Sequence, residues 1–318
     1  MKLGEDIEEI QRLGCAVLWN LAACNPHNKE SMGAASLWTA ALKAMRLYPK
    51  SEQVRVEGCA VLINLSSHGP NKPRMGAARL WEPVMKTMLA FPDSEKVQAK
   101  CCGILQNLAG DAHNAQLMSA TWVCTAVLYS MTSFRQSEEV QCNGCGALQN
   151  LSADDTNRDF LVDFCGWVPV LRAMAAFPKS ADVQSNGCGA LLNIGWASAA
   201  TRAEMAEYGA VRAVLDAMAS HSGSLDVALS ASWLLSLLWG SEEGHTSSAI
   251  AEMVSAAALV RSAMGRFASD EQLKEVGTAL LAAIEAARSG NAAASAGAAD
   301  KEAAGAPERK RRKKQSSR

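Results

Sequence analysis

The sequence lacks the segments that would direct a protein into or across a membrane. No run of about 20 uninterrupted apolar residues occurs in the chain, and a helix needs about that length to span a bilayer. The first ten residues, MKLGEDIEEI, have neither the basic start nor the apolar stretch of a signal peptide. We therefore expect a soluble intracellular protein, cytoplasmic or nuclear or both, with no membrane partner.

Motifs of catalysis and of metal binding are also missing. There is no phosphate-cradling glycine loop, no GxSxG and no HExxH. His27, His68 and His113 recur in predicted loops, but no nucleophile or carboxylate recurs beside them, so we interpret them as solvated. Cys142 and Cys145 have the spacing of metal ligands, but no second pair lies nearby. We expect no enzyme, no catalytic residue, no cofactor and no bound metal.

What the sequence does contain is a repeat. Five similar twelve-residue segments each carry an asparagine, and these asparagines are spaced by 44, 43, 43 and 43 residues. The segments are IQRLGCAVLWNL, VRVEGCAVLINL, VQAKCCGILQNL, VQCNGCGALQNL and VQSNGCGALLNI, with Asn20, Asn64, Asn107, Asn150 and Asn193. A period of this length indicates one supersecondary unit stacked on copies of itself, which is a solenoid without a single central core.

Other positions of the repeat predict three helices in each unit. A short first helix should end at small residues near Ala78 and Gly166, where a sharp corner forms most easily. A methionine nine residues before each asparagine helix marks six complete units after a lone final helix: Met45, Met88, Met131, Met174, Met218 and Met264. The second helix should stop at a proline and the third should follow a serine. These residues are Pro49, Pro92 and Pro178, and Ser51, Ser94, Ser137 and Ser180.

Small and aromatic residues recur at positions that we interpret as core. Glycine in a helix costs about 1 kcal/mol relative to alanine, so its recurrence indicates close approach of helices, at Gly14, Gly58, Gly144 and Gly187. Cysteines share the next position, Cys15, Cys59, Cys102, Cys145 and Cys188. Stacked helices pack about 10 Å apart, too far for a disulfide, so we predict buried thiols in a reducing compartment. The row Trp38, Trp81 and Trp167 fits core packing better than an aromatic binding stripe.

The residues of this unit resemble an armadillo repeat. The pattern VQxxGCGALxNL is similar to the armadillo-like repeats of leucine-rich-repeat kinases and of protist armadillo proteins, and it covers about Ile7 to Ala287. The resemblance implies an all-α fold, a right-handed α-solenoid of about six three-helix repeats plus an N-terminal half repeat, over residues 6–287. HEAT repeats are the nearest alternative, but they have two helices per unit and lack this asparagine.

The resemblance also implies that the third helices line a concave groove, with the five asparagines on its floor. A primary amide both donates and accepts, so it can hold the backbone of an extended peptide whatever its side chains. Units about 10 Å apart and strand residues about 3.3 Å apart match one asparagine to roughly every third peptide residue. Polar neighbours should make the same surface adhesive and nearly neutral: Gln98, Gln106, Gln141, Gln149 and Gln184. The alternative, that each asparagine only ties its helix end to the following loop, stays open.

One departure from the family narrows the ligand. In the importin-α branch a tryptophan stands four residues before the asparagine, and the pair builds pockets for lysine-rich signals. Here that position holds Ala16, Ala60, Gly103, Gly146 and Gly189, and Trp233 is followed by Leu237 in place of the asparagine. We therefore do not expect a general carrier of basic nuclear-localisation signals.

Charge is concentrated at the C-terminal end. The net charge is −1, but residues 307–318 hold seven basic residues and one acid, which leaves 24 basic and 31 acidic residues and a net charge of −7 elsewhere. Residues 288–308 read as a disordered linker rich in Ala, Gly and Ser. The basic tail, residues 309–318, contains Arg309, Lys310, Arg311, Arg312, Lys313 and Lys314. It has the composition of a nuclear-localisation signal read by import receptors; a solvated terminus, contact with nucleic acid, or docking onto the acidic body are alternatives.

Two functions follow from these observations. The first is a non-enzymatic scaffold whose groove binds an extended segment of another protein, mainly in the N-terminal two-thirds, because Leu237 and Ala283 replace the asparagine in the last two units. The second is a nuclear or nucleic-acid-associated factor in which the solenoid positions the basic tail. The lone first helix, with apolar Leu13, Val17 and Trp19, indicates either a covering partner or missing upstream repeats.

Overall fold

The protein is a row of stacked helices, seen in a computed structural model that describes residues 7–23, 25–119, 122–240 and 247–304. All regular structure in these residues is α-helical, and α1 (Glu8–Ala22) is followed by five units of three helices. The first helices are α2 (Pro26–Ala34), α5 (Asn71–Ala77), α8 (Ala112–Ser119), α11 (Asp155–Asp163) and α14 (Ala199–Glu207). The second helices are α3 (Trp38–Leu47), α6 (Trp81–Ala90), α9 (Val123–Ser133), α12 (Trp167–Ala176) and α15 (Ala210–Ser220). The third helices are α4 (Glu52–Ser66), α7 (Glu95–Ala109), α10 (Glu138–Leu151), α13 (Ala181–Gly195) and α16 (Leu225–Trp239).

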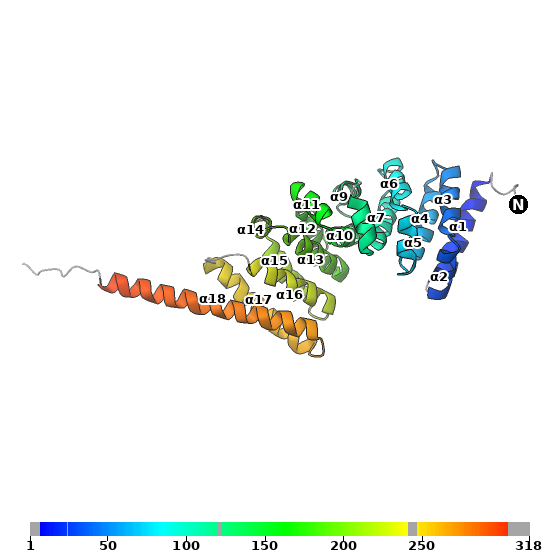
Figure 1. The fold of residues 1–318 in the computed structure, drawn as a ribbon. Helices are drawn as coiled ribbons and strands as arrows, with labels where there is room; N and C mark the ends of the chain where they lie inside the picture. Colours follow the sequence, from blue (N-terminus) through cyan, green and yellow to red (C-terminus); the bar gives the residue numbers. More distant parts are fainter. Residues whose placement is uncertain (1–6, 24, 120–121, 241–246, 305–318) are drawn as a thin grey trace, which may run out of the picture.

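Corresponding helices of successive units lie beside one another along the stack (Figure 1). The third helices therefore form one continuous layer from α1 through α16, and the second helices form another. Each helix packs on its own unit and on the neighbouring units, as expected for a solenoid. The predicted all-α solenoid is confirmed.

Local signals in the sequence set the ends of the helices. The second helices α3, α6 and α12 all end within two residues before a proline, as predicted. Ser51, Ser94 and Ser137 cap the third helices, and each hydroxyl oxygen accepts a hydrogen bond from the backbone N–H three residues later. Ser180 occupies the same N-cap position, but its side chain makes no capping hydrogen bond.

The first helices α5 and α11 end near the predicted small residues, at Ala77 and Asp163, but neither Ala78 nor Gly166 has the left-handed backbone of the corner. Left-handed backbone occurs one residue after Ala78 and one residue before Gly166, at Arg79 (φ 51°) and Cys165 (φ 49°), and also at Ser36 and Gly209. Gly166 itself has a right-handed backbone, with φ −59°. A side chain there would meet Leu161 Cδ2 at 2.7 Å, so Gly166 is required for packing instead of for the turn.

The recurring methionines and glycines belong to one packing contact. A Cβ built on Gly58, Gly144 or Gly187 would lie 2.5–2.7 Å from the nearest atom of Met45, Met131 or Met174 respectively. The methionine of each second helix thus occupies the space that the glycine of the third helix leaves open, which confirms the predicted close approach. Gly14 meets nothing within 4 Å, because no second helix precedes α1 in the described residues.

The final unit has two helices in the described residues instead of the predicted three. α17 (Ser247–Arg266) takes the place of the first and second helices, and α18 (Glu271–Ala304) takes the place of the third. Residues 247–264 contain no glycine or proline at which a corner could form. α18 also continues through residues 288–304, in place of the irregular linker predicted there, because their many alanines favour helix.

The core contains the residues assigned to it from the repeat. Trp38, Trp81 and Trp167 begin the second helices and are buried, which confirms that they are core residues. Cys15, Cys59, Cys102, Cys145 and Cys188 are buried and free. Burial raises the pKa of Cys102 and Cys188 to about 12. Across the described residues, no helix is both long enough and apolar enough to span a bilayer.

Candidate functional site

The asparagines of the repeat connect each third helix to the preceding one. In four of the five, the Nδ2 atom donates to the backbone carbonyl oxygen of the residue just before the asparagine one unit earlier. The pairs are Asn64 to Trp19 (3.1 Å), Asn107 to Ile63 (3.3 Å), Asn150 to Gln106 (2.8 Å) and Asn193 to Gln149 (2.7 Å). Bracing therefore does occur, but it joins neighbouring units, whereas the predicted alternative joined a helix end to its own following loop.

Each of these side-chain amides keeps hydrogen-bonding capacity that the contact with the preceding unit does not use. Asn64, Asn107, Asn150 and Asn193 are half-buried, and Asn20 is exposed. Among the described residues, no group donates a hydrogen bond to the Oδ1 atom of these asparagines. These hydrogen bonds fix the orientation of each side chain and leave the Oδ1 acceptor. Asn64, Asn150 and Asn193 also keep a second N–H, whereas Asn107 Nδ2 donates in addition to Ser66 Oγ at 3.1 Å.

Gln106 and Gln149, the other residues predicted to line this surface, lie across the next third helix. A Cβ built on Gly146 would be 2.2 Å from Gln106 Nε2, and one on Gly189 would be 2.3 Å from Gln149 Nε2. Ile63 approaches Gly103 in the same way, at 3.5 Å. At Gly103, Gly146 and Gly189, where importin-α has tryptophan, a side chain of the preceding unit thus covers the small residue. A pocket built around a tryptophan has no room to form there.

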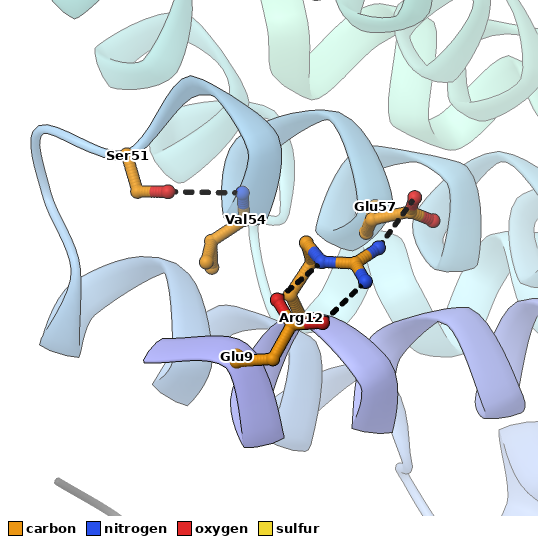
Figure 2. Close-up of polar contacts among 5 residues, drawn as sticks. All are labelled: Glu9, Arg12, Ser51, Val54 and Glu57. Carbon is orange, nitrogen blue, oxygen red and sulfur yellow. Dashed lines mark hydrogen bonds and ion pairs between the residues drawn. The ribbon is translucent and has the colours of Figure 1, made fainter. Parts of the chain in front are cut away.

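Further polar contacts link the third helices on the same face. Arg12 binds Glu9 within α1 at 2.7 Å and reaches Glu57 of α4 at 3.9 Å, close to the Ser51 cap (Figure 2). The hydrogen bond from Arg12 lowers the pKa of Glu9. Corresponding links further along are Lys100 to Glu139, Asn143 Nδ2 to Ala99 O, and Asn186 Nδ2 to Cys142 O.

The N-terminal part of this face is hollowed and charged. A depression of about 570 Å³ is lined by Arg12, Glu52, Glu57 and Lys96, among others, on α1, α4 and α7. Further along, α10 and α13 add the half-buried amides Asn143 and Asn186, beside exposed carboxylates at the start of each helix. We call the exposed surface of α1, α4, α7, α10 and α13 the third-helix face.

Three of the predicted surface glutamines are not on this face. Gln98, Gln141 and Gln184 are 1–2% exposed. The Nε2 atom of each donates to two backbone carbonyls at the end of the second helix, for example Gln98 to Met88 and Phe91. The prediction that they make the surface adhesive was wrong, because buried carbonyls at a helix end need donors.

A second row of asparagines was missed in the sequence. Asn71, Asn114 and Asn157 lie in the first helices with the same 43-residue period and are at most 3% exposed. Asn71 Nδ2 donates to Lys29 O and to Leu65 O, and Asn114 Nδ2 donates to Lys72 O and Leu108 O. Their regular spacing was the available signal, and their burial makes them structural residues.

The residues weighed for catalysis and metal binding are not brought together. His27 and His113 lie in the first turns of α2 and α8, and His68 follows α4, so only His68 is in a connection as predicted. Cys145 is buried and Cys142 is half-buried, and burial raises the pKa of both thiols. In the part of the chain that the structure describes, no group of three or more His, Cys, Asp or Glu could hold a metal ion. The basic tail from Arg309 to Lys314 lies outside the described residues.

The fold and the asparagine rows define an armadillo-repeat solenoid. Residues 1–121 match the family model described as LRRK2 ARM repeat. No curated protein matches the sequence.

Solved structures resemble most of the stack. An engineered protein, Northeast Structural Genomics Consortium Target OR329, has a TM-score of 0.63 at 18% identity, over 75% of this chain and 94% of that one. A chain of the structure reported for the phosphorylation switch between cadherin and β-catenin has a TM-score of 0.68 at 15% identity, over 88% of this chain. This chain covers 56% of that one. Armadillo-repeat domains typically serve as protein-interaction scaffolds and are generally non-catalytic.

Proposed function

We propose that the protein is a non-enzymatic scaffold whose third-helix face binds an extended segment of another protein. The observation that carries this proposal is the fixed orientation of Asn64, Asn107, Asn150 and Asn193, each held by a hydrogen bond to the preceding unit and each with an unused Oδ1. Such amides can pair with a peptide backbone without a large loss of side-chain entropy on binding. The structure reported for the interaction between cadherin and β-catenin supports a protein ligand in general.

The surface chemistry supports a segment of mixed composition. Gln106 and Gln149 add neutral amides along α7 and α10, and charges of both signs lie at the α1–α4 end. With glycine at the position of the importin-α tryptophan, binding would depend on the peptide backbone more than on lysine side chains. A spacing of about 10 Å between units corresponds to about three residues of an extended peptide.

The test compares two variants that both weaken the fold but affect different faces. Asn107→Ala combined with Asn150→Ala removes two members of the row, while Asn71→Ala removes a buried hydrogen-bonding residue and leaves the third-helix face intact. Partners recovered by affinity capture and mass spectrometry should be lost from the first variant and kept by the second. Recovery of every partner by the double variant would reject the proposal.

A second candidate function rests on the basic tail. Seven basic residues among residues 307–318, next to a body of net charge −7, favour nuclear targeting through import receptors. Deletion of residues 309–318 should then abolish nuclear accumulation of a fluorescent fusion. If the tail contacts nucleic acid instead, the deletion should remove a salt-dependent affinity for RNA or DNA. An unchanged distribution together with no salt-sensitive binding would reject this function.

A further inference from the structure

The second helices carry a row of grooves on a face distinct from the third-helix face. One groove lies between each neighbouring pair: about 690 Å³ between α3 and α6, 420 Å³ between α6 and α9, 240 Å³ between α9 and α12, and 430 Å³ between α12 and α15. The grooves follow from the repeat, but their linings differ because the exposed side chains change from unit to unit.

The groove between α6 and α9 is apolar and exposes large side chains. Leu89 is 78% exposed, Trp122 is 73% exposed and Tyr129 is 54% exposed. Met85 and Pro92 complete its walls, and Gln98 at its base already donates to Met88 O and Phe91 O. Contiguous exposed apolar side chains of this size mark interaction sites on soluble proteins.

The repeat itself does not demand an apolar lining at this place. At the position of Leu89 the other second helices carry Arg46, Thr132, Ala175 and Ala219, and at the position of Tyr129 they carry Lys43, Lys86, Arg172 and Asp216. A large apolar or aromatic side chain therefore stands at these two positions only where α6 faces α9, at Leu89 and Tyr129. Packing within the stack does not explain this choice, because both side chains point to solvent.

Cationic grooves flank the apolar groove on both sides. The α3–α6 groove is lined by Arg46, Arg55 and Lys86, and the α9–α12 groove by Arg135 and Arg172. Among the described residues, no carboxylate forms an ion pair with Arg46, Lys86 or Arg172. Positive charge is thus concentrated here on a body whose net charge is −7.

We propose that this second-helix face binds an acidic, extended segment of a partner protein. One large apolar or aromatic side chain of the segment inserts between Leu89 and Tyr129. Aspartate or glutamate residues about three positions to either side then reach Arg46 and Lys86, or Arg172, because neighbouring grooves lie about one helix separation, 10 Å, apart. The protein's own basic tail, Arg309 to Lys314, carries the wrong charge for these flanking grooves.

The test uses a random dodecapeptide phage library selected on the full-length chain, followed by fluorescence anisotropy with a synthetic copy of a selected peptide. Selected peptides should carry an aromatic or large aliphatic residue with Asp or Glu about three positions away. Leu89→Glu should weaken binding at least tenfold, and Lys86→Glu at least threefold, with weaker binding at high salt. Both side chains are exposed, so the substitutions should leave the fold intact by circular dichroism.

Two control variants show whether the peptide occupies this groove or another part of the protein. Ala219→Glu places the same charge at the position of Leu89 in α15, outside the apolar groove and the two cationic grooves, and should leave the affinity unchanged. Asn107→Ala with Asn150→Ala, the test of the third-helix face, should also leave it unchanged. The proposal is overturned if the selected peptides lack acidic residues, or if they bind equally to the Leu89→Glu variant. It is also overturned if Leu89→Glu dissolves a dimer in analytical ultracentrifugation, because the occupant would then be a second copy of the chain.

Discussion

Asn150 of α10 and Gln106 of α7 connect two neighbouring third helices through two contacts, one made by each side chain. The Asn150 side chain donates a 2.8 Å hydrogen bond to the Gln106 backbone carbonyl. The Gln106 side chain, in return, lies over Gly146, four residues before Asn150, with Nε2 2.2 Å from where a Cβ would stand. The same asparagine and glycine thus fix the spacing of the units and the polar surface between them.

Two glycines two residues apart should respond differently to alanine. A Cβ at Gly144 would meet Met131 Cγ at 2.5 Å, and Met131 is buried, so Gly144→Ala should lower the free energy of unfolding by about 1–3 kcal/mol. A Cβ at Gly146 meets only the end of the flexible Gln106 side chain and, at 3.1 Å, Asn186 Nδ2. Gly146→Ala should therefore change stability by less than about 1 kcal/mol, since helix propensity offsets the displacement. Urea unfolding measures both, and equal losses would contradict the predicted difference.

The buried asparagines should matter more for stability than those of the third-helix face. Asn71→Ala leaves the carbonyls of Lys29 and Leu65 without their donor inside the protein, and we expect a loss of about 2–4 kcal/mol. Asn64→Ala removes one hydrogen bond in an exposed setting and should cost about 1 kcal/mol. Urea midpoints of the two variants give the comparison, and the reverse order would show that the buried row is not the more stabilising one.

Relief of the left-handed corner should stabilise the protein. Cys165 is exposed and has φ 49°, a conformation that costs a residue with a side chain about 1–2 kcal/mol. Cys165→Gly should raise the free energy of unfolding by about 0.5–1 kcal/mol after the larger entropy of the unfolded glycine is subtracted. Gly166→Ala, one residue later, should destabilise because of the contact with Leu161. Thermal unfolding of both variants checks the pair; a Cys165→Gly variant less stable than the parent would refute the predicted strain at this corner.

Alkaline pH should weaken the fold through its buried thiols. Burial raises the pKa of Cys102 and Cys188 to about 12, compared with 9.0 for a solvated thiol. Below pH 9 the thiols are protonated in both the folded and the unfolded protein, so their contribution to stability is complete there. It is lost as the pH rises from about 9 toward 12, because only the unfolded chain releases these protons.

The measurement is the urea midpoint between pH 7 and pH 11. It should stay level to about pH 8 and then fall. A double variant, Cys102→Ala with Cys188→Ala, should start from a lower stability because of the small cavities, and its midpoint should fall less steeply. Parallel curves for the two proteins would rule out these thiols as the cause.

Much of the architecture could be predicted from the sequence because the signals that set it are local. Pro49, Pro92 and Pro178 each follow the end of a second helix by at most two residues, and Ser51, Ser94 and Ser137 cap the third helices. The last unit was less predictable: helix 247–266 has no corner, and the alanines after Ala287 extend α18, since composition alone does not separate a helix from an irregular linker.

The candidate site could be predicted only in part. The period places Asn107 and Gln106 on one surface, and the structure brings them to the third-helix face. The same reasoning placed Gln98 there, although it is buried and bonds to Met88 and Phe91. A side-chain amide can line a binding groove or donate to the last carbonyls of a helix, so the residue type does not distinguish these two roles.

By itself, the sequence determined the repeat length, the number of stacked third helices and the apolar positions of the core, because helix periodicity and residue size act within a single unit. Only the tertiary structure decided where each polar side chain lies and which atom it bonds. Asn150 reaches Gln106 instead of its own following loop, and Leu89 and Tyr129 meet across one groove, because both relationships depend on how a unit is set against its neighbour. That placement comes from contacts between units, such as the hydrogen bond from Asn143 Nδ2 to Ala99 O, which joins residues 44 positions apart in the sequence.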